Sequence, residues 1–280
     1  MNILITGANG YLARSLIKEL KIKKLHNLTL LVRKSSNINE LLKYCDREKI
    51  IFYDNTIKSL ENIKDHNIDL VFHLANYYPD SSRPEIPQDI IDSNFTLIVN
   101  VLAKLKLKKD IKIINVTTYL DDTSLYSLSK NAAKRYINNF NCNTIELSDT
   151  YGIKDLRPKL INLLINYSES GKKLLMKSSP DSEINLTYIK DIVRGFISSI
   201  EFASDEKKWN RGKVFAIKNQ SITLKDVIDT FNEVSSKKVI VEWLNEKFET
   251  GYHADSMVKT LPDWKPIYNL TMGLTEILKK

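Results

Sequence analysis

A tyrosine and a lysine four residues apart are the residues of this chain best suited to move a proton. Tyr126-Ser-Leu-Ser-Lys130 is the single Tyr-x-x-x-Lys sequence among 13 tyrosines. Residues i and i+4 share one face of a helix, so a helix here would hold the phenol beside the ammonium. Chance alone predicts roughly one or two such pairs, so the pattern gains weight only from its place after Asn115-Val-Thr-Thr118, an expected strand end. We therefore predict general acid/base chemistry there, with ordinary packing as the alternative.

Two glycines close to the start of the chain predict a turn that holds a phosphate. Gly7-Ala-Asn-Gly10-Tyr-Leu-Ala13 lies between an apolar strand and a helical pattern. A dinucleotide turn uses glycine for a tight bend and for close approach of backbone N–H groups to a pyrophosphate. The helix that follows adds unpaired N–H groups at its N-terminus. The spacing G-x-x-G-x-x-A is looser than the usual G-x-G-x-x-G, and the alternative is a turn that binds nothing.

The end of the second expected strand favours one form of the dinucleotide. An NAD site normally has Asp or Glu there, about 20 residues after the glycines, to bind the ribose hydroxyls. This chain has Arg33 and Lys34 instead, followed by two serines. Cations at that place favour the 2′-phosphate of NADP(H), unless Arg33 is only a solvated strand end.

Short apolar strands alternate with amphipathic helices through the first half of the chain. A long helix is expected at about residues 88–107, and another follows Tyr126. The expected strands are Ile3–Ile5, Leu28–Val32, Ile50–Tyr53, Asp69–Leu74, Ile111–Val116 and Asn143–Leu147. Apolar strands separated by helices predict a parallel sheet covered on both faces, that is, a doubly wound α/β (Rossmann) fold. We expect residues 1–152 to form this cofactor-binding domain, and residues 153–280 to form a smaller, interleaved mixed α/β domain for the substrate.

Composition excludes several classes of protein. Hydrophobic residues make up 42% and charged residues 27%, as in ordinary soluble domains. The net charge of +8 is dispersed, so we expect no nucleic-acid partner. Cys45 and Cys142 have no metal-ligand spacing and form no disulfide framework, and no metal is expected. We also expect no signal peptide and no membrane span, and hence a cytoplasmic protein.

The order of these segments resembles the extended short-chain dehydrogenase/reductases, the nucleotide-sugar epimerase/dehydratase group. The resemblance covers nearly the whole chain. The matching segments are Thr6–Ala13, Asp54, Asp69–Ala75, Asn94, Thr117–Thr118, Tyr126–Lys130, Leu147–Gly152, Tyr188–Asp191, Asp263–Pro266 and Gly273.

The resemblance implies a shared mechanism. Tyr126 would be the general acid/base toward a sugar hydroxyl or carbonyl, and Lys130 would hold the nicotinamide ribose and lower the pKa of Tyr126. Thr118 would hydrogen-bond the reacting oxygen, with Thr117 as the alternative. The implied NADP(H) contacts are Gly7, Asn9, Gly10, Tyr11, Leu12, Arg33, Lys34, Asp54, Asn55, Leu74, Ala75, Asn76, Asn94, Lys130, Leu147 and Ser148. The implied substrate contacts are Tyr77, Thr117, Thr118, Tyr119, Asp149, Arg157 and Lys159.

One departure from the family points to the reaction. Dehydratases of the family have Asp-Glu directly after the threonine, whereas Thr118 is followed by Tyr119 and Leu120. Dehydration is therefore disfavoured. The chain is most similar to CDP- and dTDP-4-keto-deoxyhexose reductases, which use NADPH and serve bacterial surface polysaccharides such as O-antigen and capsule. The alternatives are a nucleotide-sugar 4-epimerase with retained NAD and a non-catalytic NADP-binding sensor.

The resemblance also implies a homodimer. In this family two helices of each subunit meet their copies in a four-helix bundle. Here they would be the helix of Tyr126 and the long helix around Asn94. We expect Ile98, Leu102, Ala132 and Ala133 to make the contact.

Overall fold

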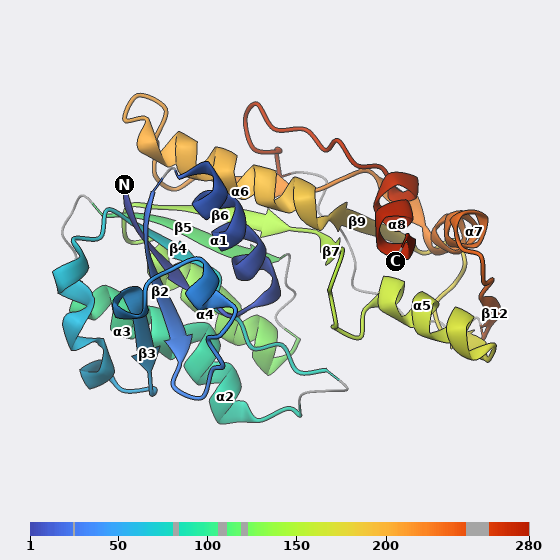
Figure 1. The fold of residues 1–280 in the computed structure, drawn as a ribbon, viewed down its shortest axis with the longest axis horizontal. Helices are drawn as coiled ribbons and strands as arrows, with labels where there is room; N and C mark the ends of the chain where they lie inside the picture. The colour runs from blue at the N-terminus through green and yellow to red at the C-terminus, as the bar shows by residue number, and fades with distance from the viewer. Residues whose placement is uncertain (25, 81–83, 106–110, 119–122, 245–257, 280) are drawn as a thin grey trace. The chain divides into compact units, whose positions relative to one another are not determined.

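The computed structural model describes residues 1–280 apart from 25, 81–83, 106–110, 119–122, 245–257 and 280 (Figure 1). The chain forms two compact units that interleave along the sequence. The first consists of Met1–Glu146 and Val193–Phe215, and the second of Leu147–Ile192 and Ala216–Lys280. The first part of this unit thus ends six residues before the expected boundary at 152, and the unit also includes the later segment Val193–Phe215.

A seven-stranded sheet in the order β10-β6-β5-β4-β1-β2-β3 organises the first unit. Its strands are β1 (Asn2–Thr6), β2 (Asn27–Arg33), β3 (Ile50–Tyr53), β4 (Leu70–His73), β5 (Lys112–Thr118), β6 (Cys142–Leu147) and β10 (Val214–Ile217). Strand β1 pairs in parallel with β2 on one side and with β4 on the other. The direction of winding therefore reverses between β1 and β4, the place where open α/β sheets bind their ligands.

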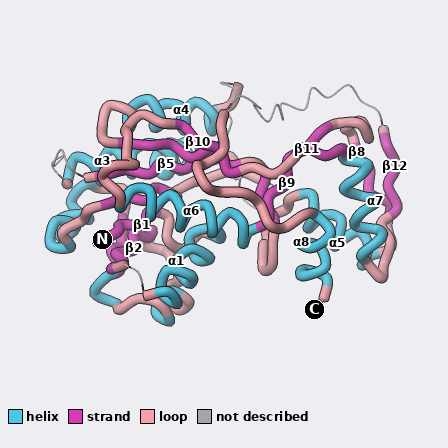
Figure 2. Tube along the Cα trace, turned by 90° about the horizontal axis from the view of Figure 1, so that it is seen from above, coloured by secondary structure: helices cyan, strands magenta, loops and turns pink. Residues whose placement is uncertain are grey.

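Helices cover both faces of this sheet, as the sequence predicted (Figure 2). Phe72 of β4 meets Phe196 edge-on, with 5.2 Å between ring centroids, while the next residue, Val71, lies in a core cluster with Ile98 and Ala133. Because alternate residues of a strand point to opposite faces, α6 covers one face and α3 and α4 cover the other. The helices are α1 (Tyr11–Lys23), α2 (Pro87–Ile91), α3 (Leu97–Lys104), α4 (Leu125–Ile137) and α6 (Ile189–Ser204), with 3₁₀ segments η1 (Leu41–Lys43), η2 (Arg47–Lys49) and η3 (Ile57–His66).

The long helix expected at about 88–107 is present but not regular. It consists of α2, a π-helical turn η4 (Asp92–Thr96) and α3. Pro87 stands in the first turn of α2, where its missing N–H costs nothing. The π-helical turn contains the fully buried Asn94. Such turns are rare inside helices and often occur at functional sites.

The described residues of the second unit form short sheets and three helices. Its strands are β7 (Asp149–Tyr151), β8 (Lys173–Met176), β9 (Glu183–Tyr188), β11 (Ser221–Thr223) and β12 (Ile240–Trp243), and its helices are α5 (Leu160–Ser170), α7 (Leu224–Val234) and α8 (Leu270–Leu278). The buried carboxylate of Asp191 accepts the backbone N–H groups of Ile267 and Tyr268 at 2.8–3.1 Å. The segment before α8 is thereby fixed to the start of α6.

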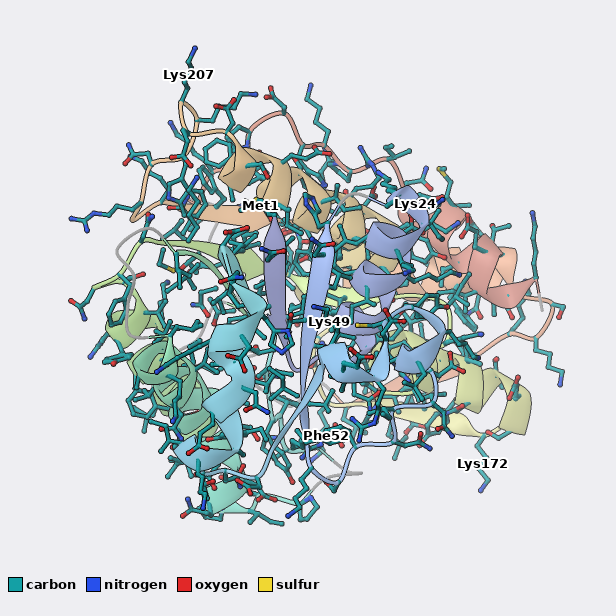
Figure 3. The ribbon with its side chains drawn as sticks, turned by 60° about the vertical axis from the view of Figure 1, so that its left-hand side comes forward. Met1, Lys24, Lys49, Phe52, Lys172 and Lys207 are labelled. Atoms are coloured by element: carbon teal, nitrogen blue, oxygen red, sulfur yellow. The ribbon has the colours of Figure 1, made fainter. Side chains whose placement is uncertain are left out.

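Exposed lysines of the first unit come from different elements. Lys24 follows α1, Lys49 ends η2 and Lys207 follows α6 (Figure 3). These cations therefore lie at separate places and form no common patch.

Gly7 has no room for a side chain. Its φ is +64°, and an added Cβ would lie 2.6 Å from the Cα of Ala75. We expect Gly7→Ala to lower the free energy of unfolding by about 3 kcal/mol. The alanine would strain the left-handed backbone, and its Cβ would overlap with the backbone of Ala75 directly after β4. Urea unfolding measures this loss.

Gly212→Ala is the matched control. Gly212 has φ +79° but nothing within 4 Å of an added Cβ, so only the backbone strain of about 1 kcal/mol is expected. Equal losses for the two variants would contradict the close approach at Ala75.

Candidate functional site

The glycine turn between β1 and α1 has the form of a phosphate cradle. The N–H of Gly10 donates to the carbonyl of Gly7 at 2.8 Å, and Gly10 then caps α1 without any side chain. Asn9 lies in the turn, and Tyr11 and Leu12 open the helix, all half-buried. A turn with no Cβ at Gly7, placed at the N-terminus of a helix, fits a dinucleotide pyrophosphate.

The carboxyl ends of β2 and β3 bring the predicted 2′-phosphate and adenine residues together. Arg33 pairs with Tyr53 in register, and the N–H of Lys34 donates to the Tyr53 carbonyl at 2.8 Å. Arg33 is exposed and forms no ion pair with any residue that the structure describes. Its guanidinium is therefore available to an anion.

Asp54 and Asn55 follow directly on β3. The carboxylate of Asp54 accepts the hydroxyl and the N–H of Thr56 at 2.6 and 3.1 Å, and these bonds lower its pKa. Asn55 has φ +70° and donates to Asp92 at 3.1 Å. Both side chains are exposed, so both are accessible to a ligand although each already has a protein partner.

A buried threonine fixes the start of the loop that follows β4. The hydroxyl oxygen of Thr6 accepts the N–H groups of Leu74 and Ala75, each at 3.2 Å. Its proton is then left for Nδ1 of His73 at 2.8 Å, so the neutral ring carries its own proton on Nε2. Burial lowers the pKa of His73 well below its usual value. Leu74 and Ala75, expected at the cofactor, thus lie beside Gly7 at the carboxyl edge of the sheet.

Asn94 and Tyr77 are positioned differently from the expectation. Asn94 is fully buried; its Oδ1 accepts the Tyr77 N–H at 2.7 Å, and its Nδ2 donates to the Tyr77 carbonyl and to the Ser129 hydroxyl. Both amide hydrogens are used, so Asn94 holds the protein together rather than contacting a cofactor. Tyr77 is also buried, and its hydroxyl donates to the Pro84 carbonyl at 3.0 Å. The prediction that Tyr77 faces substrate is therefore wrong, because its neighbours in the loop take the exposed side.

Tyr126 lies in the first turn of α4 and contacts that same loop. A capping box of Ser124 and Ser127 starts the helix. The ring of Tyr126 meets that of Tyr78 edge-on with 4.9 Å between centroids. Sequence analysis missed Tyr78, whose ring is 48% exposed beside the phenol. The one sequence feature that could have indicated Tyr78 is its position two residues after Asn76.

Lys130 is buried one turn further along α4. Its Nζ donates to the Val116 carbonyl of β5 at 3.3 Å, which brings the lysine to the strand that ends in Thr117 and Thr118. Thr117 is buried and Thr118 half-buried, so Thr118 is the more accessible hydroxyl. Tyr119 lies outside the described residues.

The expected lowering of the Tyr126 pKa by Lys130 is not observed. Burial raises the pKa of Tyr126 to about 12, a shift that Asn76 opposes and Tyr78 reinforces. Burial lowers the pKa of Lys130 to about 8. Each group is thus driven toward its neutral form, because the low-polarity surroundings penalise both charges.

The remaining predicted site residues belong to the second unit. Leu147 is buried, and the Ser148 hydroxyl bonds that of Thr187 at 2.7 Å. Lys159 forms an ion pair with Asp149 at 2.5 Å.

Arg157 is more strongly engaged. It donates to both carboxylate oxygens of Asp155, at 2.7 and 2.6 Å, and to Thr150. The expectation that Arg157 and Lys159 contact the substrate is not supported, since neighbouring carboxylates already pair with both.

The predicted dimer contacts also need correction. Ile98, Leu102 and Ala133 are at most 2% exposed and face the sheet of their own unit, so only Ala132 lies on the surface. The register of each helix turns these three apolar side chains inward.

The described residues include no group of three or more His, Cys, Asp or Glu side chains suited to a metal ion. None of the helices in the described ranges is long and apolar enough to cross a membrane.

Comparison with known proteins identifies the family. The model of the NAD dependent epimerase/dehydratase family matches residues 3–212, which include the glycine turn, Tyr126 and Lys130. The chain belongs to this family. The resemblance drawn from the sequence motifs is thereby confirmed.

Individual relatives are distant but match over the whole length. A dTDP-4-dehydro-6-deoxyglucose reductase of Escherichia coli is 24% identical over 321 residues, covering 99% of this chain and 96% of the relative. A UDP-glucuronic acid 4-epimerase of Bacillus cereus, solved with NAD, superposes with a TM-score of 0.76 at 20% identity, covering 100% and 98% of the two chains. A dTDP-glucose 4,6-dehydratase of Bacillus anthracis, also with NAD, gives 0.76 at 19% identity, covering 100% and 96%. The structural likeness establishes the fold.

The buried Lys130 predicts an unusual dependence of stability on pH. The pKa falls from 10.5 to about 8 on folding, so between these pH values the unfolded state binds a proton that the folded state lacks. Stability therefore rises with pH across this window, and below pH 8 the lysine costs up to about 3 kcal/mol. We expect Lys130→Met to be more stable than the wild type at pH 7, with the difference shrinking as pH rises to 10.5. Urea unfolding at a series of pH values measures this.

Lys112→Met is the control. Lys112 is equally buried, but its ammonium donates to the Ala203 carbonyl at 2.7 Å and to Glu206 at 2.5 Å. Its replacement should destabilise the protein at pH 7. A Lys130→Met variant that is less stable than wild type at every pH would refute the argument.

Proposed function

We propose that this protein is an NADPH-dependent reductase that converts a nucleotide-linked 4-keto sugar to the 4-hydroxy sugar. The observation that carries the proposal is the joint position of Tyr126, Lys130 and the glycine turn at one edge of the sheet. Gly7 packs on Ala75, the ring of Tyr78 three residues further along contacts Tyr126, and Lys130 reaches β5. A proton donor thus lies beside a dinucleotide cradle.

The state of Tyr126 suits reduction. Burial keeps the pKa of its phenol at about 12, so the hydroxyl is protonated at neutral pH and is ready to donate. A ketone that accepts a hydride at carbon needs one proton at its oxygen, and Tyr126 supplies it. When bound, a reduced nicotinamide supplies the hydride.

Particular residues of the chain would hold the cofactor. The turn of Gly7–Gly10 and the first N–H groups of α1 would hold the pyrophosphate, and Arg33 with Lys34 the 2′-phosphate. Asp54 and Asn55 would lie at the adenine, and Lys130 at the nicotinamide ribose.

The substrate assignment rests on the reaction and on a distant relative. The E. coli relative bears the name of a dTDP-4-dehydro-6-deoxyglucose reductase. This chain lacks the Asp-Glu that dehydratases carry after Thr118. A CDP- or dTDP-linked 4-keto-deoxyhexose is therefore the proposed substrate, with Thr118 and Thr117 toward the sugar. Arg157 and Lys159 have no part in this proposal because they are already paired.

An epimerase is the second candidate, since two of the structural neighbours are a UDP-glucuronic acid 4-epimerase and a UDP-glucose 4-epimerase. An epimerase oxidises and re-reduces one carbon and retains its nicotinamide, so it consumes none. A non-catalytic NADP-binding sensor is less favoured because this chain keeps both Tyr126 and Lys130.

We also propose a homodimer through α2–α4. Exposed apolar side chains on these helices support it, but they are Ile91 and Leu128 rather than the residues first expected. Phe95, Tyr136 and Phe140, partly exposed, form a row of edge-on rings on the same helices or directly after them. Such side chains are suitable for a helix-to-helix contact between two copies.

The experiment that tests the function offers the purified protein NADPH and a panel of CDP-, dTDP-, GDP- and UDP-4-keto sugars. Loss of absorbance at about 340 nm, the band of the reduced nicotinamide, should track product in equal amounts. Interconversion of sugars with no net consumption would support the epimerase instead.

Tyr126→Phe should remove the proton donor and leave the ring in place. We expect kcat to fall roughly 10²–10⁴-fold, the usual contribution of one general acid, with little change in KM. Steady-state kinetics at saturating cofactor measures both. Wild-type turnover in Tyr126→Phe would refute the assignment of the acid.

Arg33 should decide the choice of cofactor. A guanidinium can hold the doubly charged 2′-phosphate through two parallel charge-assisted bonds. We expect kcat/KM to favour NADPH over NADH by about tenfold or more, a difference of about 1.4 kcal/mol. Arg33→Asp should reverse the preference, because a carboxylate repels the phosphate and accepts from free ribose hydroxyls.

The cofactor content of the purified protein distinguishes the reductase from the epimerase. A protein that purifies with stoichiometric NAD, and whose cofactor preference does not change in Arg33→Asp, would overturn the reductase and favour the epimerase.

A further inference from the structure

Tyr78 presents an aromatic ring to solvent directly beside the ring of Tyr126. The Tyr78 side chain is 48% exposed, and the two rings meet edge-on, with 4.9 Å between their centroids and 89° between their planes. Single exposed apolar residues are common on protein surfaces and need no function. Tyr78 differs from these because it contacts the proposed proton donor.

The loop after β4 fixes the position of Tyr78 from the residue before it. The N–H and carbonyl of Tyr77 both bond the buried side chain of Asn94, at 2.7 and 3.1 Å, and the Tyr77 hydroxyl donates to the Pro84 carbonyl. Earlier in the loop, Ala75 is buried against Gly7, whereas Asn76 is exposed. Since Tyr77 is buried and bonded through backbone and side chain, the adjacent Tyr78 is held on the exposed side.

The same asparagine holds the helix that carries Tyr126. Nδ2 of Asn94 donates to the Ser129 hydroxyl at 3.2 Å, and that hydroxyl donates to the Tyr126 carbonyl at 2.8 Å. The segments that carry the two rings therefore share one buried anchor. A ring that is already held in place loses little conformational freedom when a ligand binds to it.

The chemistry of an aromatic ring fits one part of the substrate. The carbon that Tyr126 would serve belongs to the sugar, so the group that lies against Tyr78 is the sugar ring. Its C–H groups are apolar and weakly positive, and they suit the negative face of an aromatic ring. A deoxyhexose has a methyl group where other hexoses have a hydroxymethyl group, so packing that carbon on the ring removes no hydroxyl from water.

We propose that Tyr78 is a substrate-binding residue: its exposed ring packs against the C–H groups and the methyl group of a deoxy sugar, places the reacting carbonyl at the Tyr126 hydroxyl, and favours deoxy sugars over sugars with a hydroxymethyl group. The inference rests on the proposed function, which supplies the reacting carbonyl.

Two variants separate the ring of Tyr78 from its hydroxyl. Tyr78→Ala removes the ring, and we expect it to raise KM about tenfold for the deoxy sugar that the wild type reduces fastest, the effect of losing one aromatic contact. Tyr78→Phe keeps the ring and should keep the wild-type KM. Equal losses in the two variants would overturn the proposal, because the hydroxyl would then be the binding group.

Calorimetry measures sugar binding without turnover. Protein saturated with NADPH is titrated with dTDP, dTDP-glucose and dTDP-6-deoxyglucose, and with the three CDP counterparts; a 4-hydroxy sugar accepts no hydride, so nothing reacts. The wild type should bind the 6-deoxy sugar more tightly than the glucose. Tyr78→Ala should weaken binding of the 6-deoxy sugar about tenfold, abolish that preference and leave the affinity for dTDP or CDP unchanged.

Ile22→Ala is the matched control. Ile22 is 62% exposed near the C-terminal end of α1, the end away from the glycine turn. Its replacement should leave every one of these constants at the wild-type value. The dissociation constant for NADPH, measured by fluorescence, should also be unchanged in Tyr78→Ala. A weaker affinity for NADPH with unchanged affinity for the sugars would overturn the proposal, since it assigns the ring to the cofactor.

The same titration in a Tyr126→Phe background asks whether Tyr78 acts on the sugar or on the phenol. Tyr126→Phe keeps the second ring and removes the phenol proton, so Tyr78→Ala should weaken sugar binding there as well. Loss of the effect in that background would overturn the proposal.

Failure of the proposed function has a different signature. Sugar binding that Tyr78→Ala weakens, without consumption of NADPH on any sugar of the panel, would refute the reductase and leave the role of Tyr78 in place. Reductase activity and sugar binding that Tyr78→Ala leaves unchanged would refute the role of Tyr78 alone. Binding of no nucleotide sugar at all would refute both.

Discussion

The buried amide of Asn94 is the contact on which the proposed site depends. It joins the loop after β4 to helix α4, through Tyr77 on one side and Ser129 on the other. A buried amide left without partners would cost about 1–3 kcal/mol for each unpaired group, so the bonds form together or not at all. The π-helical turn around Asn94 is the local irregularity that accompanies this arrangement. The loop after β4 thereby brings the ring of Tyr78 beside that of Tyr126.

The site contains two ionisable side chains that burial drives toward their neutral forms. Lys130 has a pKa of about 8 and Tyr126 of about 12, and both shifts arise mainly from loss of solvent. A protein selected for stability alone would place an apolar side chain at 130. The phenol of Tyr126 is neutral at neutral pH and therefore has a proton to donate. Loss of solvent thus destabilises the fold at Lys130 and keeps Tyr126 protonated.

In the second unit, the charged side chains of Arg157, Lys159 and Asp191 bind groups of the protein itself. Arg157 is bound to Asp155 by both carboxylate oxygens, and Lys159 to Asp149. Asp191, fully buried, accepts three backbone hydrogen bonds from Ile267 and Tyr268. A diphosphate would have to displace a carboxylate to reach Arg157 or Lys159. In the first unit, Arg33 has no such carboxylate among the described residues, and this contrast makes it the better anion ligand of the two arginines.

The amino-acid sequence by itself determined the strands, the doubly wound sheet, the glycine turn and the helical Tyr126–Lys130 pair, because these depend on local periodicity and on backbone requirements. Even the left-handed bend at Gly7 is a local property. Only the tertiary structure decided which polar side chains face a ligand. Tyr77 and Tyr78 are adjacent and identical in type, yet one is buried against Pro84 and the other lies exposed beside Tyr126. The direction of the Tyr126 pKa, the pairing of Arg157 and the inward facing of Ile98, Leu102 and Ala133 likewise depend on neighbours that are distant in sequence or on burial that no local pattern encodes. Desolvation and hydrogen bonding act through space, and for these residues the spatial neighbours exist only in the folded chain.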